Sequence, residues 1–210
     1  MKKGFTLIEM VVVMAVLSLV GLVVLTIFGR TIQGSGKAQI VEIMKQNGSG
    51  ALDQMDKTIR NAEGVACPGK TATCSLPGAA CKNLIIRKED GVYVRYRFVD
   101  PVSSTSNGSI KQDNPGKATL AGSSPPREET DAEFINRACD VSDPLSSSAI
   151  TLTDTNIESG VSVENATFSR NILAGFSDEV TIQFDLKAGV ASAQVNQTPA
   201  QNFKTTIKLR

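Results

Sequence analysis

The chain has 210 residues, of which 41% are hydrophobic, 20% charged and 5% aromatic, and its formal net charge is +1. This composition excludes a disordered chain and a polytopic membrane protein, and the balanced charge predicts no broad basic surface for nucleic acid. The sequence contains no histidine. That absence excludes Ser-His-Asp and Cys-His nucleophile systems and every histidine-ligated zinc or haem site.

Apolar residues concentrate near the N-terminus. From Phe5 to Phe28 the sequence reads FTLIEMVVVMAVLSLVGLVVLTIF, in which only Glu9 is charged. A helix of this length extends about 36 Å, which is enough to cross the roughly 30 Å hydrocarbon core of a bilayer. Lys2 and Lys3 precede the run. The positive-inside rule therefore predicts a single crossing with a cytoplasmic N-terminus and the C-terminal bulk outside.

A cleaved secretory signal peptide is the alternative for this segment. Its apolar core would span about 7–15 residues and end at a small-residue cleavage site. The observed run is longer, and Gly29-Arg30-Thr31 is a poor match to such a site. The sequence therefore favours a retained transmembrane helix.

Glu9 is unusual in an apolar helix, because inserting an unpaired carboxylate costs a few kcal/mol. No Lys or Arg lies one helical turn after it. Two interpretations stay open. Either Glu9 is hydrated at the level of the lipid headgroups, or its partner is a charge on another chain or a free amine nearby.

Residues 2–9, Lys-Lys-Gly-Phe-Thr-Leu-Ile-Glu, resemble the leader and mature start of type IV prepilins. That family includes type IV pilins, minor pilins and the pseudopilins of type II secretion. The resemblance implies that a prepilin peptidase cuts after Gly4, removing a leader of residues 1–4, and N-methylates Phe5. It also implies that Glu9 pairs with the Phe5 amine of a neighbouring subunit and sets the register between subunits. Opposite charges in a low-dielectric helix bundle attract strongly, which makes this pairing physically reasonable.

A second helical pattern follows the transmembrane segment. Apolar residues recur between positions 39 and 61 at the spacings of one helix face. They are Ile40, Ile43, Met44, Ala51, Leu52, Met55 and Ile59. We expect this stripe to pack on a globular domain. The glycine pairs at 34/36 and 48/50 predict bends or a local break in the helix.

The expected organisation has three parts after the leader. Residues 5–28 form the transmembrane and assembly helix, residues 29–62 continue it, and residues 63–210 form an extracytoplasmic domain rich in β-strands. The predicted fold class is α+β and pilin-like, with a long N-terminal helix, transmembrane in its first half, packed on an antiparallel β-sheet.

The predicted sheet begins with a hairpin. Two strand-like runs, 83–89 and 92–99, flank Asp90-Gly91, and this arrangement is typical of a hairpin. Further strands are predicted at 150–153, 161–163, 179–186 and 203–209. The stretch 101–129 lacks a regular pattern and is predicted to be a long loop.

The second strand of this hairpin alternates between two faces. Val94, Tyr96 and Phe98 share one face with Val92, and the other face carries Tyr93, Arg95 and Arg97, with Arg87 and Lys88 nearby. We expect this basic face to be solvated. Contact with DNA phosphates is the disfavoured alternative.

The four cysteines are Cys67, Cys74, Cys81 and Cys139. An extracytoplasmic location favours disulfides, and four cysteines allow three pairings. We expect one bridge within 67–81 and one from that segment to Cys139, and the cysteine that joins Cys139 stays open. The spacing is not that of a zinc ribbon, so no metal is expected there.

Asp154, Asn156 and Glu158 place oxygen atoms at alternate positions, which loosely resembles a calcium loop. The acidic residue that closes such a loop is missing at the right distance. We therefore expect a solvated turn, and the predicted function involves no metal and no cofactor.

Three functions remain open. The favoured one is a minor pilin that primes assembly of a type IV pilus and lies at or near its tip. It rests on segments 52–62 and 202–210, which resemble the W-like minor pilins and J-like pseudopilins. A J-like minor pseudopilin of type II secretion is the second. A membrane-anchored extracytoplasmic enzyme is the third, and the absence of histidine and of a paired-acid motif counts against it.

The resemblance also implies partners and a location. The expected partners are other pilin or pseudopilin subunits, the prepilin peptidase and the inner-membrane assembly platform, and nucleic acid is not expected. The expected location is the inner membrane, with one crossing and the C-terminal domain outside, and then the fibre.

Overall fold

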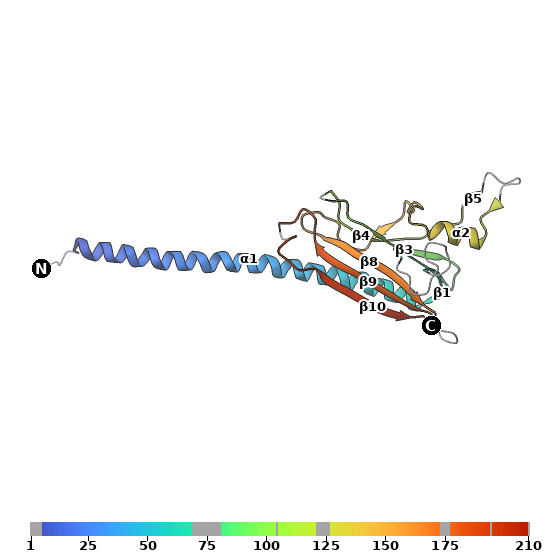
Figure 1. Ribbon diagram of the computed structural model, residues 1–210, viewed down its shortest axis with the longest axis horizontal. Coiled ribbons are helices and arrows are strands. Elements are labelled where there is room, and N and C mark those ends of the chain that lie inside the picture. The colour runs from blue at the N-terminus through green and yellow to red at the C-terminus, as the bar shows by residue number, and fades with distance from the viewer. Residues whose placement is uncertain are drawn as a thin grey trace. The chain divides into compact units, whose positions relative to one another are not determined.

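The computed structural model describes residues 6–68, 81–103, 105–120, 127–172, 177–193 and 195–209. The chain divides into two units, Met1–Gln39 and Ile40–Arg210. The elements, labelled in Figure 1, are α1 (Leu7–Arg60), β1 (Ala62–Cys67), β2 (Asn83–Lys88), β3 (Tyr93–Val99), β4 (Ser109–Asp113), β5 (Thr119–Leu120), β6 (Arg127–Glu128), α2 (Asp131–Ala138), β7 (Ile150–Thr151), β8 (Val161–Asn171), β9 (Glu179–Ala188) and β10 (Gln201–Lys208). The long helix and antiparallel sheets confirm the predicted α+β class.

The helix α1 is unbroken from Leu7 to Arg60, so the local break predicted near its glycine pairs is absent. A glycine inside a helix costs about 1 kcal/mol relative to alanine. At Gly48 the absence of a side chain leaves room for a residue from another element. A Cβ at this position would lie 2.3–2.6 Å from ring atoms of Phe203 on β10. The bare backbone therefore allows the ring to approach α1 closely.

The globular unit contains two main antiparallel sheets. The first has the strand order β1-β2-β3-β4-β7, and the second has the order β10-β9-β8. The predicted hairpin between β2 and β3 is confirmed, with Arg87 opposite Tyr93. Its turn contains Gly91 with a φ of 78°, a conformation that glycine adopts without steric cost.

All four later strands predicted from the sequence are present, as β7, β8, β9 and β10. The strand β8 is longer than predicted, because a bulge between Glu164 and Thr167 allows its pairing with β9 to resume as far as Asn171. Asn165 lies in this bulge with a φ of 49°, a region that asparagine tolerates better than most residues.

The prediction that the stretch 101–129 is a long loop is wrong, because this stretch contains the strands β4, β5 and β6. The sequence of β4, SIKQD, is short and polar. It becomes a strand through its pairing with β3, in which Ile110 lies opposite Phe98. The strand β1 and the helix α2 were also not predicted.

The main core of the globular unit joins both sheets to the second half of α1. Met44, Met55 and Ile59 of α1 are fully buried in it, which confirms that the predicted apolar stripe packs on the domain. Phe98 of the first sheet stacks on Phe168 of the second, with ring centroids 4.3 Å apart. Burying each large apolar side chain contributes about 1.5–3 kcal/mol.

A smaller core lies on the other face of the first sheet, beneath α2. Thr130 and Glu133 form a capping box at the start of this helix. Phe134 of α2 is fully buried against Ile85 of β2, and its ring centroid lies 4.7 Å from that of Tyr93. The first sheet is therefore covered on both faces.

We expect alanine to have opposite effects at two neighbouring glycines of α1. Gly50→Ala meets no atom within 4 Å and should raise the free energy of unfolding by about 1 kcal/mol. Gly48→Ala should lower it by about 1 kcal/mol, because overpacking against Phe203 outweighs the helix propensity. Urea unfolding of the full chain in detergent micelles, followed by tyrosine fluorescence, measures both. Equal stabilisation by the two variants would contradict the close packing.

Candidate functional sites

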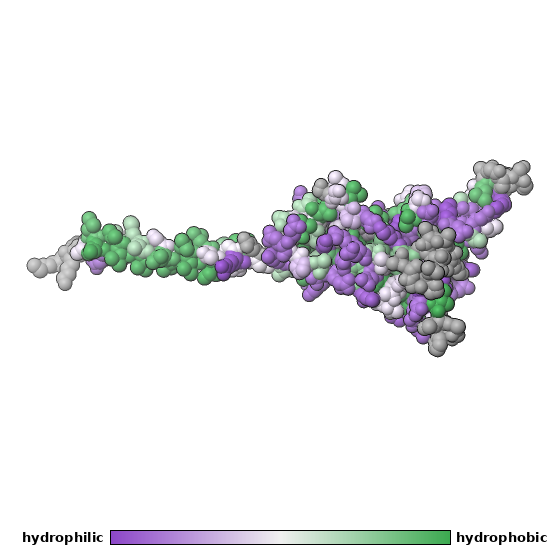
Figure 2. Space-filling view, viewed as in Figure 1, coloured by the Kyte–Doolittle hydropathy of each residue, from purple (hydrophilic) through white to green (hydrophobic). Residues whose placement is uncertain are grey.

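The first half of α1 presents an apolar surface that none of the described residues covers. Every large apolar side chain from Leu7 to Ile32 is exposed, and Figure 2 shows a nearly continuous hydrophobic surface along this segment. Among the described residues, α1 is the one helix long and apolar enough to cross a membrane. Since each exposed aliphatic side chain gains about 1.5–3 kcal/mol on burial, the segment needs a bilayer or other apolar helices around it.

The hydroxyl groups within this segment are satisfied by the helix itself. Ser18 Oγ donates to the Met14 carbonyl at 2.8 Å, and Thr26 Oγ1 donates to the Leu22 carbonyl at 2.8 Å. Hydroxyls bonded in this way add little to the cost of an apolar environment. These hydroxyl groups therefore do not prevent the segment from lying in hydrocarbon.

Glu9 lies in the first turn of α1 and forms a reciprocal pair with Thr6. Its Oε2 accepts hydrogen bonds from the backbone N–H and the Oγ1 of Thr6, both at 3.3 Å. The backbone N–H of Glu9 in turn donates to Thr6 Oγ1 at 3.3 Å. This is a capping box, which our sequence analysis missed although Thr-x-x-Glu is its signature. The carboxylate also lies at the helix end that favours negative charge.

The predicted cleavage site between Gly4 and Phe5 and the predicted methylation site at Phe5 lie outside the described residues. Both stay predictions. The first described residue, Thr6, follows Phe5 directly in the chain.

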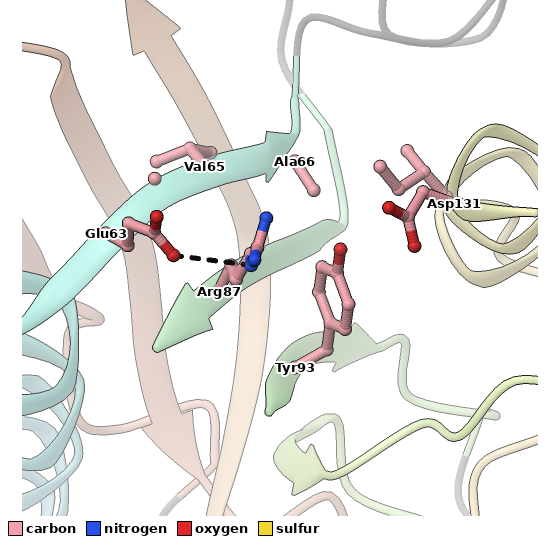
Figure 3. Close-up of a pocket in the computed structure, with 8 residues that line it drawn as sticks. Glu63, Val65, Ala66, Arg87, Tyr93 and Asp131 are labelled. Atoms are coloured by element: carbon pink, nitrogen blue, oxygen red, sulfur yellow. Dashed lines mark ion pairs between the residues drawn. The ribbon is translucent and has the colours of Figure 1, made fainter. Parts of the chain in front are cut away.

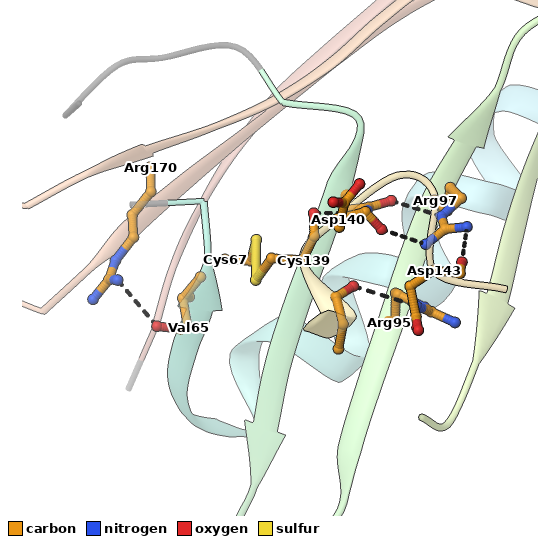
Figure 4. Close-up of a disulfide and its surroundings, with 10 residues drawn as sticks. Val65, Cys67, Arg95, Arg97, Cys139, Asp140, Asp143 and Arg170 are labelled. Carbon is orange, nitrogen blue, oxygen red and sulfur yellow. Dashed lines mark hydrogen bonds and ion pairs between the residues drawn. A yellow bond between two sulfur atoms is a disulfide. The ribbon is translucent and has the colours of Figure 1, made fainter. Parts of the chain in front are cut away.

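Cys67 and Cys139 form a disulfide that joins the end of β1 to the C-cap of α2, as Figure 4 shows. Their Cα atoms are 6.0 Å apart and 72 positions apart in sequence. The structure thereby identifies the partner of Cys139, which the sequence left open. Cys81 is also disulfide-bonded, and Cys74 lies outside the described residues. In the chain-entropy account, a cross-link over this length contributes about 4 kcal/mol to stability.

The basic face of β3 is buried, which corrects the expectation of a solvated surface. Arg95 is 1% exposed and Arg97 is 7% exposed, because α2 and the segment that follows it cover this face. Neither guanidinium is accessible to a DNA backbone. Of the basic residues considered with them, Arg87 is exposed and Lys88 is half-buried.

Arg95 is the centre of an ion-pair network. Its Nε and Nη2 donate to the two carboxylate oxygens of Asp113 at 2.8 and 2.6 Å, and its Nη1 donates to Asp143 at 2.5 Å. The other oxygen of Asp143 accepts from Arg137 of α2 at 2.8 Å. Arg137 also pairs with Glu129 at 2.8 Å. The network therefore fastens α2 and the following segment onto β3 and β4.

The network lowers the pKa values of two of its carboxyl groups, those of Asp113 and Glu129. Burial by itself would raise the pKa of Asp113, but hydrogen bonds from Arg95 and the Ser146 amide, together with nearby positive charge, lower that pKa below its ordinary value. A hydrogen bond from Arg137 lowers the pKa of Glu129 in the same way. A depressed pKa in the folded state means that the carboxyl stabilises the fold above its unfolded pKa.

The loosely calcium-like residues form an exposed turn. Asp154 Oδ1 accepts the Asn156 amide at 3.0 Å, and Asn156 Oδ1 accepts the Glu158 and Ser159 amides at 2.9 and 3.0 Å. These are Asx turns, in which a side-chain oxygen bonds the backbone just after it. The described part of the chain contains no cluster of three or more His, Cys, Asp or Glu residues that could hold a metal.

We expect Arg95→Met to lower the free energy of unfolding by about 3–5 kcal/mol, because it leaves the buried Asp113 without its ion-pair partner and removes one of the two cations that bind Asp143. Lys57→Met is the matched control, since it breaks an exposed ion pair with Asp53 and should cost less than about 1 kcal/mol. Urea unfolding by tyrosine fluorescence compares the two. Similar effects from both variants would show that Arg95 contributes no more than a surface charge.

Acid should destabilise the globular unit through the same carboxylates. Because the pKa of Asp113 is depressed on folding, its stabilisation is complete above the ordinary value of 3.8 and declines as pH falls below it. The midpoint of urea unfolding should therefore drop between about pH 4 and pH 2. The drop should be smaller in Asp113→Asn, and an identical drop would contradict this assignment.

Comparison with known proteins bears on the N-terminal segment. A protein-family model described as the prokaryotic N-terminal methylation motif matches residues 1–25. The matched residues include Glu9 and most of the exposed apolar surface of α1. Comparisons with curated proteins and with solved structures found no match. The N-terminal segment of the chain therefore carries this methylation motif, and the long apolar helix with its α+β fold is consistent with a pilin-like protein.

Proposed function

We propose that the chain is a minor pilin, a structural subunit that primes assembly of a type IV pilus and lies at or near its tip. The observation that carries this proposal is the exposed apolar surface of Leu7–Ile32, which begins inside a prepilin-type methylation motif. A prepilin peptidase cuts after Gly4 and methylates Phe5. The subunit then waits in the inner membrane with its C-terminal unit outside.

Assembly moves the apolar segment from lipid into a bundle of similar helices. Both environments keep the side chains of Leu7–Ile32 away from water, so the transfer does not sacrifice the free energy of hydrophobic burial. Polar contacts then determine the axial position of the helix relative to its neighbours in the bundle. Glu9 is the one charged residue between Phe5 and Phe28, and its carboxylate pairs with the Phe5 amine of a neighbouring subunit.

The capping box provides hydrogen bonds to the Glu9 carboxylate before assembly. Thr6 supplies two hydrogen bonds to one carboxylate oxygen, Oε2, so the charge is partly satisfied in the single subunit. The other oxygen, Oε1, stays available for the amine of a neighbour. An ion pair formed in a low-dielectric bundle favours one register strongly over the others.

A J-like minor pseudopilin of type II secretion is the second candidate. Segments 52–62 and 202–210 resemble both this group and the W-like minor pilins. The second of these segments contains all of β10 except Gln201, and the first contains the partly buried end of α1. Both functions use the same helix-transfer mechanism, and they differ in the fibre that the subunit joins.

Glu9→Gln should separate processing from assembly. Peptide mass spectrometry on the protein from its native host should find N-methylated Phe5 at the N-terminus of both the wild type and this variant. The amount of Glu9→Gln in sheared fibres should fall at least about tenfold, since loss of one low-dielectric ion pair exceeds 1.4 kcal/mol. Glu42→Gln, an exposed change farther along α1, is the matched control. A native chain that starts at Met1 would refute the proposal.

Deletion of the gene distinguishes the two family members. Loss of surface pili with normal export of secreted hydrolases supports the minor pilin. Loss of export with normal piliation supports the pseudopilin.

A further inference from the structure

The strand β10 lies at one end of the three-stranded sheet, whose order is β10-β9-β8, and Figure 1 shows it as the outermost strand of that sheet. It pairs with β9 from Gln201 to Lys208 in one uninterrupted register. A strand in this position has backbone hydrogen-bonding groups on its outer side that its own sheet does not use.

The alternation of an antiparallel ladder identifies those outer groups. The N–H of Leu209 donates to the carbonyl of Asp178 at 3.0 Å, in the same register as the pairing of β10 with β9. Every second residue before Leu209 therefore also bonds to β9, and the residues between them direct their N–H and C=O groups outward. Three of these outward residues are Asn202, Lys204 and Thr206.

The outward backbone groups of these three residues have no hydrogen-bond partner among the described residues. All three residues are exposed. The edge therefore presents N–H donors and C=O acceptors together, at intervals of about 6.8 Å along the strand. Another extended polypeptide segment carries the same groups at the same intervals, so its backbone matches this row.

The other outer strands of the two main sheets are interrupted, partly paired or short. The register of β1 against β2 shifts twice, and the Val65 carbonyl on β1 accepts from Arg170 at 3.0 Å. On β8, Phe168 exchanges backbone hydrogen bonds of 2.6 and 2.8 Å with Cys81. The strand β7, at the far end of the first sheet, has two residues. Bulges and short strands of this kind prevent strand addition.

The pocket beside β1 provides no comparable row of groups. It has a volume of about 320 Å³, and Figure 3 shows Glu63, Arg87, Tyr93 and Asp131 around it. Arg87 pairs with Glu63 at 3.3 Å, and Asp131 pairs with Lys117 at 2.8 Å. Because these charged groups already pair within the chain, the pocket does not identify a ligand.

The outward side chains of β10 indicate which residue of a partner would lie beside them. Lys204 lies opposite Gln183 of β9 and forms no ion pair with any described residue. Asp185, on the same face of β9, already accepts from Asn202 and Asn165 at 2.7 and 2.8 Å. An Asp or Glu opposite Lys204 in an added strand would form a favourable cross-strand pair.

A second copy of β10 is a poor occupant of the same edge. Every antiparallel register that aligns Lys204 with an outward residue of a second β10 places it opposite or diagonal to a lysine of that copy, either Lys204 or Lys208. Like charges in these positions are destabilising. The lysines therefore oppose self-pairing, a role that lysine commonly has on edge strands.

We propose that the outer edge of β10 binds an extended segment of another protein as an additional antiparallel strand, with an Asp or Glu of that segment opposite Lys204. The backbone row supplies the affinity, and the acidic residue favours one register. Antiparallel addition continues the pairing that β8, β9 and β10 already have. The proposal rests on this edge alone and does not require the proposed minor-pilin function.

The test uses the full chain in detergent micelles and fluorescein-labelled Gly-Thr-Val-Glu-Val-Thr-Gly. Two further forms of this peptide carry one N-methyl group, either on the Glu or on the Val that follows it. In the proposed register the Glu N–H donates to the Lys204 carbonyl, and the Val N–H points away from β10. Fluorescence anisotropy should show that the methyl group on Glu weakens binding at least about tenfold and the one on Val less than about twofold.

Variants of the chain test the same edge from the other side. Thr206→Pro removes an outward N–H and leaves the backbone hydrogen bonds to β9 in place, so it should weaken binding of the unmethylated peptide at least about tenfold. Thr206→Ala is its control and should change nothing, since only the side chain is lost. The comparison of N-methylated peptides uses the wild-type chain and therefore does not depend on the folding of Thr206→Pro.

Lys204→Gln tests the choice of an acidic residue. It should weaken binding of the unmethylated peptide by about threefold, as should replacement of the peptide's Glu by Gln, and the two changes together should weaken it no further. Lys45→Gln, an exposed change on α1, is the control and should leave the affinity unchanged.

Three results would overturn the proposal. The first is no binding of the unmethylated peptide at about 1 mM. The second is equal weakening by the two N-methyl groups, which would show that the peptide does not pair through the edge. The third is self-association of the wild-type chain that Thr206→Pro abolishes, measured by sedimentation velocity, which would make a second copy the occupant.

Discussion

The large apolar side chains from Leu7 to Ile32 are exposed in the described part of the chain, and the proposed function depends on this constraint. A helix that is apolar on all sides is stable only in lipid or among similar helices. The segment therefore needs a bilayer or other apolar helices around it. In the proposed function Glu9 sets the axial position, because it is the one charged residue between Phe5 and Phe28. The capping box with Thr6 reconciles this charge with a monomeric state.

The globular unit differs from this exposed helix, because both faces of its first sheet are buried. One face packs on α1 and the second sheet through an aliphatic and aromatic core. The other lies beneath α2 and the segment after it, which the ion pairs of Arg95 and the Cys67–Cys139 bond hold in place. Polar side chains on the second face are therefore structural. Arg97 is held on the same face by Asn83 and by the backbone carbonyls of Asp140 and Asp143.

Sequence reasoning succeeded where a pattern had a single physical meaning. The alternation in 179–186 and the Asp90-Gly91 turn each predicted an element that is present. Sequence reasoning failed where a segment's structure or exposure depends on another segment that packs against it. The residues of β4 are too polar to predict a strand until β3 pairs with them. Arg95 and Arg97 alternate with buried residues and therefore look solvent-exposed, because no local signal shows that α2 lies over them. The glycines of α1 suggest a break, and only the ring of Phe203 explains why Gly48 suits an unbroken helix.

By itself, the sequence indicated the N-terminal methylation motif, the membrane-compatible helix and the α+β class. These depend on local composition and on short spacings, which are independent of the rest of the chain. Tertiary structure decided that Cys67 joins Cys139, that the basic face of β3 is buried, and that Arg97 lies opposite Lys111 of β4. Each of these depends on contacts between residues far apart in sequence, and such contacts exist only after the chain has closed its loops and selected its strand partners.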